Sequence, residues 1–120
     1  MIRQAIIPLA GLGTRLLPLT SVFAKELLPM NGKPGIEYIL DECIDAGIKE
    51  VVFIISNKKK MIKKYFYNDH FYKSIIKKKN DKRIILEYKK ILKYKKMIRF
   101  VYQNNPKGTG DAVLKTKKII

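Results

Sequence analysis

The chain has 120 residues, of which 47% are hydrophobic, so it can form one ordinary domain with a single core and is not globally disordered. Its formal net charge of +16 lies entirely in the second half. Residues 1–57 carry five basic and six acidic residues, whereas residues 58–120 carry twenty-one and four. Lysine, isoleucine, tyrosine and asparagine, which have AT-rich codons, are all plentiful. We therefore attribute the charge to compositional bias and do not expect a nucleic-acid partner.

Cysteine content and hydropathy limit the cellular setting. Cys43 is the only cysteine, which excludes an intrachain disulfide and fits a cytoplasmic protein. No segment approaches the ~20 apolar residues that span a bilayer, and the apolar N-terminal stretch is too short for a signal peptide. We expect no membrane partner.

In chain order, the first half predicts a strand, a turn, a helix and a second strand. Residues 2–9 read as a short buried strand, and the glycine-rich segment 10–15 as a turn. Apolar residues recur at helical spacing over 36–46, and Gly47 is a plausible end of that helix. The continuous apolar run within 50–56 predicts a strand covered on both faces, as in a parallel sheet.

The second half continues the alternation. Residues 58–67 and 70–79 predict short basic helices, residues 81–94 a longer helix that begins at 81 or 82, and residues 97–103 a third strand. A final helix is expected to start near Asp111. This order predicts an α/β fold, a Rossmann-like three-layer α/β/α domain with about three parallel strands. Because three strands make a thin sheet with an uncovered side, we expect the domain to be incomplete.

The turn after the first strand is the first candidate site. Its backbone N–H groups lie at the strand's carboxyl end, where parallel sheets bind ligands. Gly11 and Gly13 let the main chain approach a phosphate closely, and Arg15 adds a guanidinium suited to phosphate oxygens. Leu16 stands where the dinucleotide fingerprint needs glycine, and the P-loop pattern is absent. A plain tight turn is the alternative for these two glycines.

A second candidate site follows the third strand. The strand ends at Gln103, and Gly108 and Gly110 precede the final predicted helix. The N-terminus of a helix offers unpaired N–H groups and the positive end of a dipole, which suits an anionic or polar ligand. A plain connection from loop to helix is the alternative.

The longer strings around these sites resemble a known family. Residues 11–20, then Lys-Glu-Leu-Leu-Pro at 25–29 and Lys-Pro at 33–34, resemble the signature of sugar-1-phosphate nucleotidyltransferases. The Ala-Gly-Leu-Gly variant looks most like the bacterial UTP–glucose-1-phosphate uridylyltransferases. Ser21 and Ala24 depart from the pattern, which commonly has Lys and Pro there, so we expect a less rigid loop before Lys25.

The resemblance implies transfer of a uridylyl group from UTP to glucose 1-phosphate, giving UDP-glucose and pyrophosphate. It makes residues 1–120 the N-terminal nucleotide-binding portion of a nucleotidyltransferase domain whose C-terminal remainder is absent. Arg15 and Lys25 are then the catalytic candidates, which hold the triphosphate, while Gln103 and Gly108 face uracil. The implied nucleotide-binding residues are Ala10, Gly11, Leu12, Gly13, Thr14, Arg15, Lys25, Glu26, Gln103 and Gly108.

The resemblance also implies a Mg²⁺ ion whose ligands lie beyond Ile120, so we expect this chain alone to be inactive or nearly so. The full-length enzyme is expected to form a homo-oligomer. Three alternatives stay open: a nucleotidyltransferase that uses dTTP, a basic nucleic-acid-binding module, and a non-catalytic regulatory remnant. Asp111 stands where the family often has His, and we interpret it as structural.

Other conspicuous residues are expected to be structural. Cys43 lies on the apolar face of the first helix, and His70 has no partner at metal-ligand spacing. We interpret the acidic edge of the first helix as a solvated face; its residues are Glu37, Asp41, Glu42 and Asp45. We interpret a run of aromatic residues as core anchors; they are Tyr65, Phe66, Tyr67, Phe71 and Tyr72.

Overall fold

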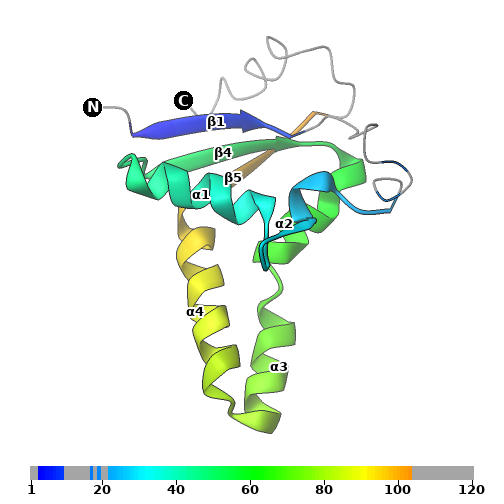
Figure 1. Ribbon diagram of the computed structural model, residues 1–120, viewed down its shortest axis with the longest axis vertical. Helices are drawn as coiled ribbons and strands as arrows, with labels where there is room; N and C mark the ends of the chain where they lie inside the picture. Colours follow the sequence, from blue (N-terminus) through cyan, green and yellow to red (C-terminus); the bar gives the residue numbers. More distant parts are fainter. Residues whose placement is uncertain (1–2, 10–16, 18, 20–21, 104–120) are drawn as a thin grey trace.

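The computed structural model describes residues 3–9, 17, 19 and 22–103. Three parallel strands form its main sheet in the order β1 (Gln4–Pro8), β4 (Glu50–Ile55) and β5 (Ile98–Tyr102), with helices against one face (Figure 1). The predicted parallel strands are therefore confirmed, each within two residues of its expected bounds. The predicted glycine turn and the helix near Asp111 lie outside the described residues.

The central strand β4 forms the core of the sheet. All five residues from Val51 to Ile55 are 0% exposed, which confirms the interpretation of this apolar run as a strand covered on both faces. Alternate side chains point to opposite faces, so Val51, Phe53 and Ile55 join one cluster with the helices. Val52 and Ile54 point to the other face and are equally buried.

Three helices pack their apolar residues on the same face of the sheet. They are α1 (Gly35–Asp45), α2 (Lys60–Phe66) and α4 (Lys82–Met97). Each contributes two side chains to the core cluster: Ile36 and Leu40, Ile62 and Phe66, and Ile91 and Tyr94. These helices supply one of the two helical layers expected from the sequence, and a second layer is not among the described residues.

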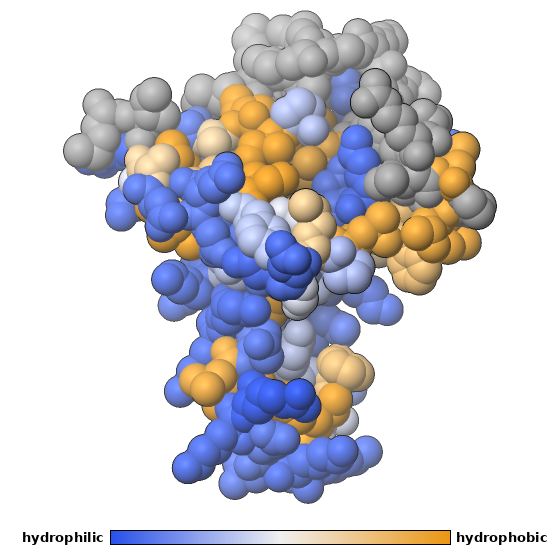
Figure 2. All heavy atoms as spheres, viewed as in Figure 1, coloured by the Kyte–Doolittle hydropathy of each residue, from blue (hydrophilic) through white to orange (hydrophobic). Residues whose placement is uncertain are grey.

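The helices α3 (Asp69–Lys79) and α4 form a hairpin that projects from the sheet (Figure 1). Asn80 takes a left-handed conformation after α3, and the Asp81 side chain caps α4 by accepting from the Arg83 N–H at 2.8 Å. No residue of α3 is fully buried. Figure 2 shows hydrophilic residues over most of this projection, interrupted by a small hydrophobic cluster. The predicted helices are confirmed here, and α4 runs three residues further than expected.

The sequence analysis did not predict a small hairpin of β2 (Pro29–Met30) and β3 (Lys33–Pro34). Its turn is Asn31-Gly32, with φ of 51° and 88°, the two positive values that a tight two-residue turn requires. The flanking prolines indicated a loop. The Tyr38 hydroxyl donates to the Met30 carbonyl at 2.7 Å, which fastens the hairpin to α1.

The interpretation of the acidic edge of α1 as solvated is wrong for Glu37, which is buried, and Asp41 is only partly exposed. Glu37 is 1% exposed, accepts a hydrogen bond from the Tyr65 hydroxyl and lies 3.1 Å from the Lys90 ammonium. Asp41 accepts from the Tyr94 hydroxyl at 2.7 Å and pairs with Lys33. The other two residues, Glu42 and Asp45, are exposed as expected. Charged and phenolic side chains from α2 and α4 turn this edge into an interhelical contact.

The aromatic run is likewise only partly core. Phe66 is fully buried, and Tyr65 and Tyr72 pack against the core cluster. Tyr67 and Phe71 are 43% and 53% exposed, so their interpretation as core anchors is wrong. Cys43 is confirmed as a residue packed against the core, and its burial raises the pKa of the thiol.

We predict that Phe53→Ala destabilises the fold by about 3–5 kcal/mol, because it removes a buried ring from the central strand and leaves a cavity. Leu86→Ala is the control, since Leu86 is 65% exposed and its loss is expected to change stability by less than about 0.5 kcal/mol. Urea denaturation measures both, and equal effects would contradict the assignment of this core.

We also predict that protonation of Asp41 contributes to the fall in the free energy of unfolding at low pH. Burial works against ionisation of this carboxyl, but the hydrogen bonds from Lys33 and Tyr94 outweigh it and lower the pKa. A lowered folded pKa gives stability that is present above the ordinary value near 3.8 and is lost as the pH falls through the folded pKa. Asp41→Asn should therefore flatten the fall in unfolding free energy below about pH 4. Asp45→Asn, an exposed residue of the same helix, should leave that slope as in the parent chain.

Candidate functional site

The carboxyl ends of the three strands lie side by side and define the candidate site. The Leu9 N–H donates to the Ile54 carbonyl, and the Gln103 N–H to the Ile55 carbonyl, both at 2.7 Å. Gln103, a predicted base contact, is 2% exposed and lies directly beside the end of β4. Parallel α/β sheets bind their ligands at this edge. The predicted residues Ala10, Gly11, Leu12, Gly13, Thr14, Arg15 and Gly108 lie outside the described residues.

Two other predicted site residues form a short 3-10 turn, η3 (Lys25–Leu27). Its backbone is closed by hydrogen bonds from the Leu27 N–H to the Ala24 carbonyl at 3.0 Å and from the Leu28 N–H to the Lys25 carbonyl at 3.2 Å. Lys25 is exposed, whereas Glu26 is only 7% exposed. The turn therefore directs two adjacent charged side chains to different environments.

Glu26 points to a buried partner that the sequence analysis did not identify. The Lys59 ammonium donates to both carboxylate oxygens, at 2.9 and 3.0 Å, and each side chain is 6% exposed. Lys59 belongs to η4 (Asn57–Lys59), which follows β4 directly. Burial lowers the pKa of Lys59, the bonds and charge of Glu26 raise it, and the charge of Lys25 lowers it further. The ion pair joins η3 to the carboxyl end of the central strand.

The sequence placed Lys59 in a basic helix, where a solvated side chain was the natural interpretation. Its neighbours Lys58 and Lys60 are indeed exposed. The signal that could have singled it out was position, since Lys59 lies four residues after the last residue of β4. Residues just after the strands of a parallel sheet lie at its ligand-binding edge. No local pattern distinguishes it from the flanking lysines.

Ala24, which precedes Lys25 and stands where the family commonly has proline, is held by a contact that the sequence did not indicate. Ala24 has φ of −67° and ψ of 133°, the extended conformation that proline would also adopt. Its backbone N–H lies 3.1 Å from the Met61 sulfur and donates to it, and the residue is 4% exposed. A proline ring at this position would meet the sulfur. Met61 thus supplies a contact to the alanine that a proline could not make.

Ser56 adds a polar group at the same edge. It follows β4, is 5% exposed, and its hydroxyl oxygen has no hydrogen-bond partner in the described part of the chain. Burying a hydroxyl without a partner is unfavourable, so such a group is a candidate for contact with a ligand.

The described residues do not supply a metal site. No cluster of three or more His, Cys, Asp or Glu side chains occurs among them. The carboxylate nearest Lys25 in the chain is that of Glu26, and both of its oxygens already accept from Lys59. None of the described helices has the length and apolar character needed to cross a membrane.

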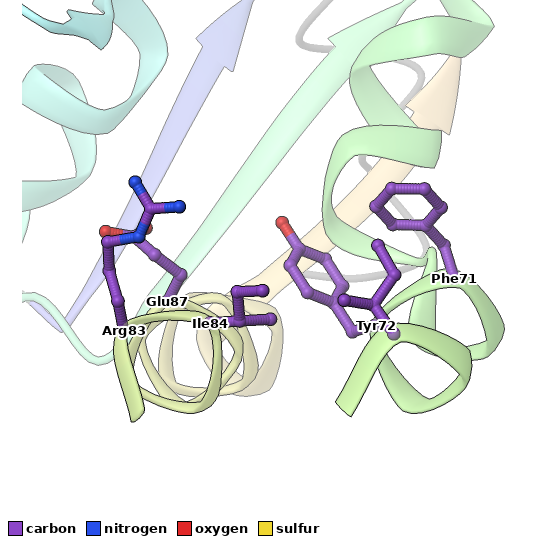
Figure 3. Close-up of a pocket in the computed structure, with 6 residues that line it drawn as sticks. Phe71, Tyr72, Arg83, Ile84 and Glu87 are labelled. Carbon is purple, nitrogen blue, oxygen red and sulfur yellow. The ribbon is translucent and has the colours of Figure 1, made fainter. Parts of the chain in front are cut away.

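A separate groove lies between α3 and α4, with a volume of about 330 Å³. Figure 3 shows Tyr72 of α3 and Ile84 of α4 directed toward each other across it, with Arg83 and Glu87 side by side on α4. The Tyr72 ring stacks on Tyr88 with ring centroids 5.2 Å apart. The groove contains none of the predicted site residues, so it is distinct from the edge of the sheet.

This parallel sheet, with its polar residues gathered where the strands end, is typical of α/β domains that bind nucleotides. The chain belongs to the nucleotidyl transferase family, whose sequence model matches residues 4–120.

Two similar relatives are both UTP–glucose-1-phosphate uridylyltransferases. The chain is 42% identical over 119 residues to the UTP–glucose-1-phosphate uridylyltransferase of Mycoplasma pneumoniae, and 38% over 113 residues to that of Escherichia coli K12. These matches cover 99% and 94% of this chain, but only 40% and 37% of the relatives.

Similar solved structures include two UDP-glucose pyrophosphorylases. A UTP-bound UDP-glucose pyrophosphorylase from Acinetobacter baumannii matches with a TM-score of 0.88 at 32% identity, over 99% of this chain and 42% of that one. A UDP-glucose pyrophosphorylase complexed with UDP-glucose matches with a TM-score of 0.73 at 30% identity, over 100% and 42%. The chain thus spans about two fifths of the length of its relatives, and the expected fold class is confirmed.

We predict that Lys59→Met lowers the free energy of unfolding by about 3 kcal/mol or more, because it leaves the Glu26 carboxylate buried without its partner. Replacing both partners, in Glu26→Leu/Lys59→Met, should restore stability to near that of the parent chain, since a well-packed apolar pair costs no desolvation of charge. Chemical denaturation measures both. Lys58→Met is the matched control at an exposed neighbour, and an equal loss there would contradict the role of the ion pair.

Proposed function

We propose that this chain forms the nucleotide-binding part of an enzyme that transfers a uridylyl group from UTP to glucose 1-phosphate, giving UDP-glucose and pyrophosphate. The observation that carries the proposal is the turn η3, which holds Lys25 exposed while Glu26 is paired with Lys59, four residues after the end of β4. The likeness to a structure with UTP bound, over 99% of this chain, supports it. The names of the curated relatives support the sugar-phosphate substrate.

In the proposed reaction, a phosphate oxygen of glucose 1-phosphate forms a bond to the α-phosphorus of UTP. The bond from that phosphorus to the bridging oxygen breaks, and its electron pair leaves with pyrophosphate. Catalysis of such transfers rests on positioning and charge neutralisation. Arg15 and Lys25 would hold the triphosphate and offset the charge that grows on the leaving group. The remaining proposed phosphate contacts are the backbone groups of residues 10–14.

The base would lie near the end of β5. Gln103 is buried there, and its side-chain amide has both a donor and an acceptor that can match the edge of uracil. Gly108 is proposed on the same side of the base, with Ala10, Gly11 and Glu26 on the other. The two bonds from Lys59 leave acceptor capacity on the Glu26 carboxylate, so that contact is compatible with the ion pair.

Nucleotidyltransferases of this family generally use a divalent metal. We propose Mg²⁺ for the whole enzyme, with ligands other than the described residues. We also propose a cytoplasmic enzyme that assembles as a homo-oligomer.

The proposal is tested by calorimetric titration of the folded chain with UTP. Arg15→Ala and Lys25→Ala should each weaken binding by roughly 10–100-fold, the effect of losing one charge-assisted hydrogen bond to phosphate. Lys77→Ala, which removes an equal charge from the far end of α3, should leave the affinity unchanged. Competition between UTP and dTTP distinguishes the two bases. A well-folded sample that binds no nucleoside triphosphate would contradict the proposal.

A further inference from the structure

The Glu26–Lys59 ion pair joins η3 to η4, the turn that follows the central strand. Successive residues of a 3-10 turn point roughly 120° apart, so a turn that has one side chain anchored inward has the direction of its neighbour fixed as well. Glu26 is anchored by two bonds to Lys59, and the adjacent Lys25 is exposed. Whatever holds Glu26 therefore also sets where the Lys25 ammonium can reach.

We infer that Lys59 is a positioning residue of the nucleotide site: by holding the Glu26 carboxylate it aims Lys25 at the phosphates of the bound nucleotide. The inference rests on the proposed function of Lys25. Lys59 itself would touch neither the nucleotide nor the reacting atoms, because its ammonium is buried and faces the carboxylate.

The charges around Lys25 and Lys59 support a binding role for Lys25 and a positioning role for Lys59. Among the described residues Lys25 forms no ion pair, so its charge is available to an anionic ligand. Lys59 lies close enough for the two ammonium groups to repel each other. Glu26 neutralises Lys59 and so prevents a second positive charge from displacing Lys25. An apolar residue at 59 would remove the repulsion but also release the carboxylate, and the turn would lose the two hydrogen bonds that join it to the segment after β4.

The binding test uses UMP and UTP, because their affinities differ through the β- and γ-phosphates. Lys59→Met should lower the ratio of UTP to UMP affinity by roughly tenfold, the value of one charge-assisted bond to phosphate. The ratio is the readout because a changed contact between Glu26 and the base would affect both affinities alike. Lys59→Arg keeps the charge and the paired donors and should restore most of the ratio. Lys58→Met and Lys60→Met, at the exposed neighbours, should leave it unchanged.

The pathway through Lys25 is tested by a double-mutant cycle. Once Lys25→Ala has removed the ammonium, adding Lys59→Met should lower the UTP to UMP ratio no further, because both changes remove the same contact. Glu26→Leu/Lys59→Met, whose apolar pair is expected to hold residue 26 inward again, should recover most of the ratio. An unchanged ratio in Lys59→Met, with Lys25→Ala still weakening UTP binding, would overturn the inference and leave the proposed function standing.

Amide hydrogen exchange tests, without nucleotide, whether Lys59 holds the turn η3 in place. The Leu27 and Leu28 amides, which close the turn, should exchange roughly tenfold faster in Lys59→Met than in the parent chain, relative to the Phe53 amide, because local opening no longer breaks an ion pair. The Phe53 amide in the central strand is the reference for global stability. If no chain binds UTP, the proposed function fails, and this measurement still decides whether Lys59 holds the turn. Unchanged exchange at the Leu27 and Leu28 amides would overturn the inference that Lys59 holds the turn.

Discussion

The buried ion pair of Glu26 and Lys59 is the contact on which the candidate site depends. Removing two charges from water is costly, and the pair is favourable only because the ammonium reaches both carboxylate oxygens within 3.0 Å. In return it joins η3 to the segment that follows the most deeply buried strand of the sheet. The turn around Lys25 is thus held by this ion pair, by the contact between Ala24 and Met61, and by the packing of Ala24 and Leu27 against the core.

The strand β4 provides the other half of this arrangement. Its five buried side chains fix the register of both neighbours, pairing Ile6 with Val52 and Val52 with Arg99. Fixed register places the ends of the three strands at one level, so that Leu9, Ser56 and Gln103 meet at the same edge. The polar groups of the site are therefore arranged by apolar packing several residues away from them.

Periodicity and turn chemistry were sufficient to predict the parallel strands and the four helices, because each of these elements is encoded locally. The resemblance of the strings at 11–34 and 103–110 indicated the family and the site. Contacts between distant segments could not be predicted in this way. Glu37 and Asp41 looked solvated because their partners, Tyr65, Lys90 and Tyr94, are 28 to 53 residues away. Lys59 differs from its neighbours only by its place in the fold.

The hairpin of α3 and α4 lowers the entropic cost of the long connection between the parallel strands β4 and β5. Val51 pairs with Ile98, a separation that would normally carry a large entropic cost of loop closure. The base of the hairpin is closed by the ion pair of Asp69 and Lys95 at 2.9 Å, and Lys95 also lies over the Tyr67 ring. The helices leave and return at nearly the same point, so the sheet experiences a much shorter connection. Insertions or deletions of whole helical turns at the tip would leave the sheet and its ligand-binding edge undisturbed.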